Sequence, residues 1–319
     1  MIGKYKIEIY DNRIHYEFDI KRNITVIQGD SGTGKTSLLR MISDYDRLGK
    51  GSGITLICDK KCVVLNSSDW KSFIQNSHEA IIFVDENQPY ISSGEFADAL
   101  RYSDNYFVLI YRDSLPRLAY SIDEIYGIRE DKKYSGLKKT YNEFYKIYNI
   151  DTVKDFHPDI VITEDSNSGF DFFSALFQDH CISAEGKSNI TEMCVSAGQN
   201  NNTVLAIVDG AAFGSDIQAF IRRHRHNINK CLLYAPESFE YLVLTSGIIE
   251  ADNDVLKNTY DYADSCSFFS WEQFYTNYLT EISSDSPIYR YSKKKLAKAY
   301  LTEGNIKKIK AVIPVIIKP

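Results

Sequence analysis

The sequence contains no apolar run of the roughly 20 residues that span a bilayer, so it predicts no membrane-spanning helix. Its first residues alternate between polar and apolar types and carry charges, which argues against a signal peptide. Internal repeats, low-complexity tracts and heptad runs are missing as well. These absences predict a cytoplasmic globular protein without a membrane partner.

The chain also has no excess of positive charge. Its formal net charge is -6, so the surface as a whole should not attract nucleic acid. Contact with nucleic acid would need a local basic patch, and residues 221–226 (IRRHRH) are the candidate. The alternative interpretation of this cluster is a solvated helix end, which the helix dipole favours.

Paired metal-binding cysteines are lacking, since none of the six cysteines belongs to a CxxC motif. Most lie inside apolar runs, which predicts buried, reduced thiols, with a zinc site as the lesser alternative. Scattered histidines show no ligand spacing, and no serine lies in a GxSxG motif. The cysteines are Cys58, Cys62, Cys181, Cys194, Cys231 and Cys266, and the scattered histidines are His15, His78, His157 and His180.

The 319 residues suffice for two domains of roughly 100–200 residues each. Short apolar runs alternate with segments of helical periodicity, which predicts an α/β fold with a mostly parallel sheet. We interpret residues 131–157 as a linker or extra helix, and the lysine-rich residues 291–301 as a solvated terminal helix. Expected strands cover residues 4–10, 14–20, 23–28, 54–58, 61–65, 80–87, 105–113, 122–130, 158–165, 202–210 and 230–236, and expected helices cover residues 37–48, 68–76, 94–103, 169–178, 188–195, 214–225, 237–246 and 270–282.

Small residues and a lysine follow the strand expected at residues 23–28, in the spacing GxxxxGK[ST]. In such a loop the backbone N–H groups converge on phosphates, and the next helix directs its positive end at the same charge. We expect Lys35 to reach the β- and γ-phosphates and the Thr36 hydroxyl to bind Mg²⁺. The alternative is a glycine-rich turn with an incidental lysine. The loop consists of Gly29, Asp30, Ser31, Gly32, Thr33, Gly34, Lys35 and Thr36.

Two acids and an arginine end the next apolar strands. Asp85 and Glu86 follow the run IIFV, at the carboxyl end of a strand, where α/β sheets bind ligands. We expect Asp85 to hold Mg²⁺, directly or through water, and Glu86 to polarise the attacking water. Arg112 is the candidate sensor of the γ-phosphate, on its own chain or on a neighbour's, which would need a homo-oligomer; Arg117 is a further candidate. The alternatives are solvated acids and a surface arginine.

This half of the chain resembles the P-loop NTPases, in particular the additional-strand group with Walker A, Walker B and a sensor strand. The resemblance covers residues 20–130 and implies binding and hydrolysis of ATP with Mg²⁺. About fifty residues separate Lys35 from Asp85. That spacing is too short for the helical subdomain that transporter-type ATPases insert there.

A second group of acids lies in the C-terminal half. Glu164 and Asp165 end one apolar strand, and Asp209 ends a later one, with Asp216 in the turn that follows. Carboxylates at neighbouring strand ends bind Mg²⁺, which neutralises a phosphodiester and generates a nucleophile. We expect Glu164, Asp209 and Asp216 to bind metal and Glu164 to act as general acid or base. The alternative is a sheet whose loops carry ordinary N-capping acids.

This half resembles the Toprim domains of topoisomerases, primases and OLD-family nucleases. Glu164 matches the first acid of that family, and Asp209 and Gly214 match the outer positions of its DxDxxG motif. Residues 186–190 (GKSNI) resemble the glycine–lysine segment of OLD-type domains. The run PESFEYL, with Glu240, resembles a segment of Toprim-related bacterial defence proteins.

Ala211 departs from this family pattern, because it stands where the second aspartate of DxDxxG is expected. The resemblance implies a P-loop domain over residues 1–130 that gates a Toprim-like, Mg²⁺-dependent nuclease domain over residues 158–319 in anti-phage defence. Two alternatives stay open. One is a nucleotide-dependent binding module with a degenerate Toprim-like domain, and the other is a metabolic P-loop enzyme such as a small-molecule kinase.

Overall fold

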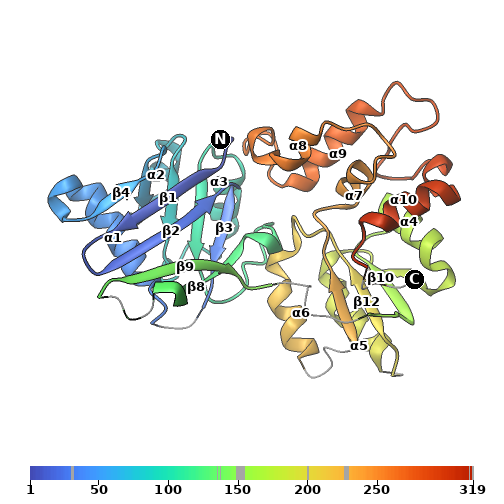
Figure 1. Cartoon of the computed structure of the whole chain (residues 1–319), viewed down its shortest axis with the longest axis horizontal. Helices are drawn as coiled ribbons and strands as arrows, with labels where there is room; N and C mark the ends of the chain where they lie inside the picture. The colour runs from blue at the N-terminus through green and yellow to red at the C-terminus, as the bar shows by residue number, and fades with distance from the viewer. Residues whose placement is uncertain are drawn as a thin grey trace. The chain divides into compact units, whose positions relative to one another are not determined.

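The computed structural model describes residues 1–29, 32–134, 136, 138–148, 155–199, 201–225, 230–315 and 317. It is a mixed α/β structure with a nine-stranded mixed sheet and a four-stranded parallel sheet (Figure 1). The chain divides into two compact units, Met1–Tyr148 with Tyr260–Phe269, and Asn149–Thr259 with Ser270–Pro319. Within the described ranges, no helix combines the length and apolarity that crossing a membrane requires.

Five parallel strands form one side of the nine-stranded sheet, with β5 at its edge. Every residue of the three middle strands of these five is buried, as is typical of parallel strands covered on both faces. The order across the sheet is β5 (Cys62–Val64), β6 (Ile81–Val84), β7 (Tyr106–Ile110), β3 (Ile24–Ile27) and β8 (Ile125–Glu130).

Four further strands extend this sheet beyond β8. β9 (Thr140–Lys146) pairs antiparallel with β8 and parallel with β2 (Ile14–Ile20). β1 (Tyr5–Tyr10) and β4 (Thr55–Ile57) continue the sheet as antiparallel neighbours. The order of these four strands from the edge inward is β4-β1-β2-β9.

The linker or helix expected at residues 131–157 is wrong over the length of β9. Aromatic side chains in this segment pack against a neighbouring strand of the sheet: Phe144 stacks on Phe18 of β2, with ring centroids 4.1 Å apart. Cross-strand aromatic pairs of this kind stabilise strand pairing. Residues 149–154 of the expected linker lie outside the described residues.

Helix α1 (Lys35–Leu48) follows β3 and covers the first sheet with one apolar face. Leu38, Leu39 and Met41 on that face are buried, and the helix ends at Gly49, which has a φ of 54°. Such a glycine is a common helix stop. Two shorter helices, α2 (Trp70–Gln75) and α3 (Gly94–Arg101), begin at the side-chain caps Asp69 and Ser93.

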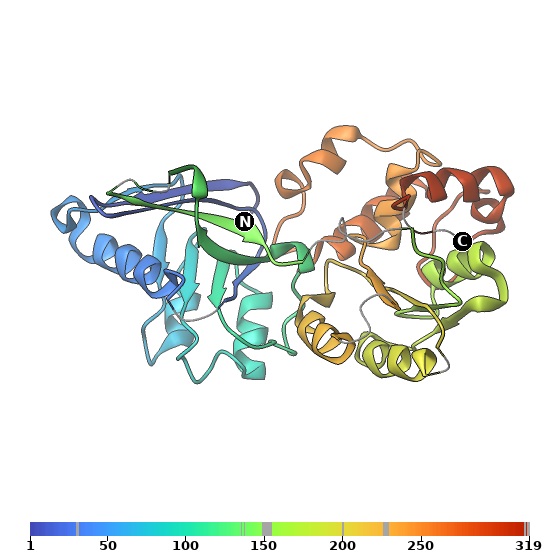
Figure 2. The ribbon, with the colours of Figure 1, turned by 60° about the horizontal axis from the view of Figure 1, so that its bottom comes forward.

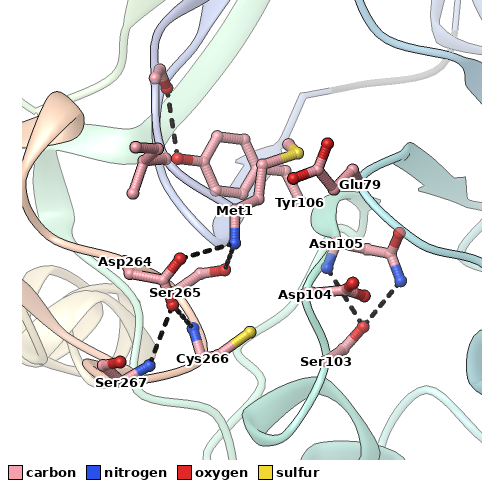
Figure 3. A network of polar contacts seen from close by, with 12 residues as sticks. Met1, Glu79, Ser103, Asp104, Asn105, Tyr106, Asp264, Ser265, Cys266 and Ser267 are labelled. Atoms are coloured by element: carbon pink, nitrogen blue, oxygen red, sulfur yellow. Dashed lines mark hydrogen bonds and ion pairs between the residues drawn. The ribbon is translucent and has the colours of Figure 1, made fainter.

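The segment Tyr260–Phe269 folds with the first unit although it is distant in sequence. Figure 3 shows the polar network that holds it. The Met1 amino group donates to Asp264 Oδ2 at 3.2 Å and to Ser265 Oγ at 2.9 Å, while Asp264 Oδ1 accepts from the Cys266 backbone N–H at 2.8 Å. The first unit is thus assembled from two separate stretches of chain.

The sheet of the second unit is parallel throughout. Its order is β11 (Cys181–Ser183), β10 (Ile160–Thr163), β12 (Val204–Ile207) and β13 (Cys231–Tyr234). No strand was expected at the position of β11, which has only three residues, none of them buried. An edge strand this short and this exposed lacks the apolar run that marks its neighbours.

Helices pack on both faces of this second sheet. α4 (Ser168–Phe177) connects β10 to β11, while α5 (Lys187–Gly198) and α6 (Ile217–His224) make the two crossovers in the opposite direction along the sheet. Right-handed crossovers place α5 and α6 together on one face and α4 on the other. Figure 2 shows α5 and α6, in yellow and gold, on one side of the strands.

The rest of the second unit is helical and irregular. Residues 291–301 are not the expected solvated helix, because only Lys298–Leu301 is helical, as a 3₁₀ turn, and Tyr291 and Tyr300 are buried. The remaining α-helices are α7 (Phe239–Thr245), α8 (Asn253–Lys257), α9 (Trp271–Ile282) and α10 (Glu303–Val312). The other 3₁₀ turns are Gly49–Ser52, Ile122–Glu124, Lys132–Tyr134, Gln178–His180, Phe213–Ser215 and Thr259–Asp261.

Candidate functional site

The loop expected to bind phosphate, residues 29–36, lies between the carboxyl end of β3 and the start of α1. Gly29, Gly32 and Gly34 have φ values of 135°, 85° and 95°. Glycine enters this region of backbone space without the steric cost that a side chain brings. The glycines of the motif therefore provide the turns that bring the loop back onto the helix.

Lys35, the first residue of α1, folds its side chain back into this loop. Its Nζ atom donates to the Gly29 carbonyl oxygen at 2.6 Å and to the Thr33 hydroxyl oxygen at 3.1 Å, and the residue is 7% exposed. The side chain of Thr36 is exposed. A positive charge thus lies inside a glycine-rich turn at a helix N-terminus. Two residues of the expected loop, Asp30 and Ser31, lie outside the described residues.

Tyr16 of β2 supports the loop from the side of the sheet. Its hydroxyl group donates to the Gly34 carbonyl oxygen at 2.8 Å, and its ring is fully buried. A Cβ atom placed on Gly34 would lie 2.8 Å from the Tyr16 hydroxyl oxygen, closer than real Cβ contacts. Burial raises the pKa of Tyr16 to about 12, so the phenol stays protonated and able to donate.

The three strands that precede the expected nucleotide-binding residues end at one level. Ile27 of β3 pairs with Ile110 of β7, and Leu109 of β7 pairs with Val84 of β6. β7 therefore lies between the strand that leads into the loop and the strand that leads into the acids. Residues that follow the three strands share one edge of the sheet.

Asp85, Glu86 and Arg112 lie at this edge. Arg112 Nε and Glu86 Oε2 form an ion pair at 2.9 Å, which joins the ends of β6 and β7 within one chain. The Asp85 carboxylate accepts from the Glu86 backbone N–H at 2.8 Å and from Asn87 Nδ2 at 3.1 Å. Arg117, the further arginine candidate, lies beside the start of α3 rather than in this pair.

In the second unit, the structure brings Glu164 and Asp209 together. Thr163 of β10 pairs with Ile207 of β12, so the two acids follow neighbouring strands at the same edge. The Asp209 backbone N–H donates to Glu164 Oε2 at 3.1 Å. The two carboxyl groups line one cavity of about 30 Å³, which is enough for one or two water molecules or a single ion.

Further charged residues surround this acidic pair. Glu240 of α7 is 2% exposed and lines the same cavity, and Tyr291 donates to its Oε1 atom at 2.7 Å. Lys293 also lines the cavity and forms an ion pair with Glu272. Neither Glu272 nor Lys293 was expected at this site, because neither lies near a strand end or in a motif.

Burial among like charges changes the protonation of the pair. Burial, with the charge of Glu272 as the main electrostatic contribution, raises the pKa of Glu164 to about 7. Burial and the charges of Glu272, Glu240 and Glu164 raise the pKa of Asp209 well above its ordinary value. Desolvation and like charge both disfavour the ionised form of a carboxyl group. The site therefore holds carboxyl groups that a nearby cation would ionise.

Asp165 and Asp216, the other two acids of this group, are placed differently. Asp165 lines the cavity, but its carboxylate accepts two hydrogen bonds from Asn167. Asp216 forms an ion pair with Lys187 at 3.2 Å and accepts a hydrogen bond from Ser215. Lys187 opens α5, so the glycine–lysine segment binds the turn that follows β12, and Asp216 does not line the cavity of Glu164 and Asp209.

Ala211, the departure from the DxDxxG pattern, is buried. It is 3% exposed, and its backbone N–H donates to the Glu237 carbonyl oxygen at 3.1 Å. A Cβ atom on the preceding Gly210 would lie 2.6 Å from the Ala235 carbonyl oxygen. The turn after Asp209 is therefore packed closely against the residues that follow β13, and glycine is required at position 210.

The described part of the basic cluster, residues 221–225, lies toward the amino ends of the strands of this sheet. It ends α6 and leads toward the start of β13, whereas Asp209 follows the carboxyl end of β12. Arg223 pairs with Glu192 at 3.5 Å, and His224 is buried. The basic cluster and Asp209 therefore lie at opposite ends of the strands, and the structure does not support phosphate binding by the two together. His226 lies outside the described residues.

Comparison of the sequence with protein-family models and with curated proteins finds no match. Evidence about function therefore comes from the arrangement of the side chains.

The contact between Tyr16 and Gly34 yields a prediction about the loop. Tyr16→Phe removes one buried hydrogen bond and keeps the ring, so we expect unfolding free energy to fall by about 0.5–1.5 kcal/mol. Urea denaturation of both proteins measures the change. Tyr10→Phe, on the neighbouring strand, is the matched control and should have a smaller effect. An unchanged stability of Tyr16→Phe would show that this hydrogen bond does not support the loop.

The raised pKa of Glu164 yields a second prediction. In the metal-free protein the folded state binds a proton between about pH 4.5 and pH 7 that the unfolded state releases, so stability falls as pH rises through this window. Glu164→Gln carries no such charge. Its stability relative to wild type should therefore improve from about pH 5 to about pH 8, by roughly 1–3 kcal/mol.

Urea unfolding in the presence of a chelator, at both pH values, measures this difference. Glu281→Gln serves as the control, because Glu281 is exposed on α9 and should show no such dependence. The same stability difference at both pH values would mean that Glu164 ionises normally in the folded protein.

Proposed function

We propose that the first unit binds and hydrolyses a nucleoside triphosphate, with ATP as the substrate, and that the second unit uses Mg²⁺ to cleave nucleic-acid phosphodiesters. The nucleotide part is supported by the loop at residues 29–36 and the position of Lys35 within it. The cleavage part depends on one observation, the meeting of Glu164 and Asp209 in a single cavity.

The candidate residues of the first unit each have a role in the proposed reaction. Lys35 would exchange its contacts with Gly29 and Thr33 for contacts with the β- and γ-phosphates. Thr36 and Asp85 would hold Mg²⁺, and their hydroxyl and carboxylate oxygens suit that ion. When bound, Mg²⁺ would neutralise phosphate charge. Glu86 would orient the attacking water.

The pair of Glu86 with Arg112 adds a condition to this mechanism. A carboxylate oxygen that is held by a guanidinium group is not available to accept a hydrogen bond from the attacking water in the same direction. Arg112 would have to turn from Glu86 toward the γ-phosphate for both residues to act. Nucleotide binding would then release the base and complete the site in one step, which suits a switch.

The order of the strands gives this proposal independent support. One strand, β7, lies between the loop strand β3 and the acid strand β6. The additional-strand group of P-loop NTPases, which the sequence resembles, has its sensor residue on a strand in this position. Arg112 lies two residues beyond Ile110, where β7 ends. A small-molecule kinase would also need a site for the molecule that accepts the phosphate. Neither Asp85 nor Glu86 is an evident residue of such a site.

Lys35→Ala tests the nucleotide part of the proposal. We expect the loss of the ammonium group to reduce ATP hydrolysis by roughly 10²–10³-fold, as for other charge-stabilising groups. Phosphate release and equilibrium ATP binding are measured on the purified chain. Lys50→Ala is the matched control, since Lys50 is exposed beyond the end of α1. Unchanged turnover in Lys35→Ala would refute the assignment of the loop.

The acidic cavity supports the second activity through its chemistry. Glu164 and Asp209 would hold Mg²⁺, and the cavity of about 30 Å³ has room for one ion. Once bound, Mg²⁺ would supply charge neutralisation at the phosphate and promote loss of a proton from water. Without a bound cation, a pKa of about 7 allows Glu164 to exchange a proton near neutral pH, and a bound cation would favour its ionised form, which can act as a ligand or a base.

Lys293 favours a second candidate function, binding of nucleic acid without cleavage. Burial lowers the pKa of its ammonium group, but the charges of Glu272, Glu240 and Asp209 outweigh this and hold the pKa above its usual value. The acidic cluster therefore already contains a cation from the protein. With Ala211 in place of a third acid, this cation could replace the metal and leave a recognition surface.

Glu164→Gln separates the two functions. If the site cleaves, we expect the variant to lose roughly 10²–10⁴-fold in Mg²⁺-dependent cleavage of DNA or RNA while ATP hydrolysis is unchanged. Labelled single- and double-stranded substrates are incubated with Mg²⁺ or Mn²⁺, with and without ATP. Glu281→Gln is again the control. Dependence on ATP would support gating of one unit by the other.

The wild-type protein decides between the candidates in the same assay. Retention of labelled nucleic acid without cleavage in either metal would favour the binding module. Absence of both binding and cleavage would contradict both candidates for the second unit and leave the nucleotide proposal untouched.

A further inference from the structure

Three metal-binding side chains meet in the second unit, apart from the acidic cavity. Cys194 comes from α5, His224 is the last residue of α6, and Cys231 is the first residue of β13. One ligand atom from each, two sulfurs and a ring nitrogen, lie within 4.8 Å of one another. All three residues are buried, at 1%, 6% and 6% exposure.

His224 is the least explained member of this group. It is about nine-tenths buried, and its Nε2 atom has no hydrogen-bond partner among the described residues. The ring packs on Phe220, with ring centroids 4.4 Å apart, so packing holds it in place. A buried polar atom without a partner is unfavourable by about 1–3 kcal/mol, and a metal ion is one way to satisfy it.

The cluster lies at the amino ends of the strands. Cys231 pairs with Val204, the first residue of β12, whereas Glu164 and Asp209 follow the carboxyl ends. Cys194 lies in the second half of α5, and α5 contacts α6 (Figure 1). The three side chains also line a cavity of about 310 Å³, which provides a path for an ion to enter.

We propose that Cys194, His224 and Cys231 form a zinc site that fastens α5, α6 and β13 to one another. Two thiolates and an imidazole are a ligand set for tetrahedral Zn²⁺. With bonds of about 2.3 Å to sulfur and about 2.0 Å to nitrogen, such an ion holds its ligand atoms roughly 3.5–3.8 Å apart, so the observed cluster needs little movement. No described residue adds a fourth ligand atom, and a water molecule from the cavity completes the tetrahedron.

Protons balance in this reaction. Binding of Zn²⁺ deprotonates both thiols and releases two protons to solvent, while His224 contributes the lone pair of its neutral ring. The product carries no net charge, since two thiolates balance the ion, which suits a buried position.

A Cys194–Cys231 disulfide is the main competing arrangement. It would use both sulfurs but leave the His224 nitrogen without a partner. It would also need an oxidant, which a reducing compartment does not provide. The metal site accounts for all three residues, whereas the disulfide accounts for two.

Metal uptake by the full chain tests the proposal. Reduced, metal-stripped protein is titrated with Co²⁺, whose thiolate charge-transfer and visible bands report a tetrahedral sulfur site, and Zn²⁺ is then added in competition. We expect about one ion per chain and displacement of Co²⁺ by Zn²⁺. Carboxylates give no thiolate band, so the cavity of Glu164 and Asp209 does not contribute to this signal.

Single substitutions identify the ligands. Cys231→Ser and His224→Asn should each weaken Zn²⁺ binding by more than roughly 100-fold, because even outer partners of metal ligands contribute 10–100-fold. Cys181→Ser is the matched control: this cysteine lies on the same sheet but outside the cluster and should leave binding unchanged. Equal loss in the control would overturn the assignment.

A measurement on the wild-type chain keeps the proposal testable if a variant fails to fold. Zn²⁺ should protect two of the six thiols from alkylation, and mass spectrometry should locate the protection at Cys194 and Cys231. Absence of protection and of the cobalt band in reduced, folded protein would overturn the site. So would isolation of the chain from a reducing cytoplasm with these two cysteines joined in a disulfide.

Discussion

Parallel pairing with level strand ends is the constraint on which both candidate sites depend. In a parallel pair, the residues that directly follow the two strands lie at the same end of the sheet. Strand pairing alone therefore makes them neighbours. The pairing of Ile27 with Ile110, and of Thr163 with Ile207, brings two sets of charged residues to such edges. If either register slipped by one residue, every side chain of that strand would move to the opposite face of the sheet and the charged groups would separate.

The same constraint creates an electrostatic difficulty in the second unit. It brings Glu164 and Asp209 together at an edge that α7 and the 291–301 stretch also cover, so acidic groups lie partly buried side by side. The structure contains three responses: raised pKa values, a tyrosine that donates to Glu240, and the ammonium group of Lys293. A metal ion would be a fourth, and it would compete with Lys293 for the same carboxylates. Occupancy of the site would then depend on where Lys293 lies.

The sequence predicts most of the central strands, because parallel strands are continuous apolar runs and the loops between them carry glycine and acids. β9 and β11 were missed for opposite reasons: the first is charged and tyrosine-rich, and the second is short and exposed. The pairing of Glu164 with Asp209 was predictable, since both follow apolar strands. The position of Lys293 was not predictable, because it is one of several neighbouring lysines with no periodic pattern. Its place at the site depends on the path of the chain after α9.

The cysteines show the same limit more sharply. Three of the six are buried as expected, two are partly buried and Cys266 is exposed, which corrects the expectation at that residue. His224 lies within a basic run that suggests a solvated surface, yet it is buried beside Cys194 and Cys231. No spacing rule finds these three residues, because their meeting depends on two crossovers and not on a local motif.

The two edges of the second sheet also differ in ligand chemistry. Oxygen ligands gather at the carboxyl edge and sulfur with nitrogen at the amino edge, so hard Mg²⁺ and softer Zn²⁺ would bind at different edges without competing. An ion held at the amino edge would fix the starts of β12 and β13 through the helices that lead into them. Because a strand is short and stiff, fixing its start limits the movement of its end, where Asp209 follows β12. A structural ion would thereby hold the acidic pair in place without touching it.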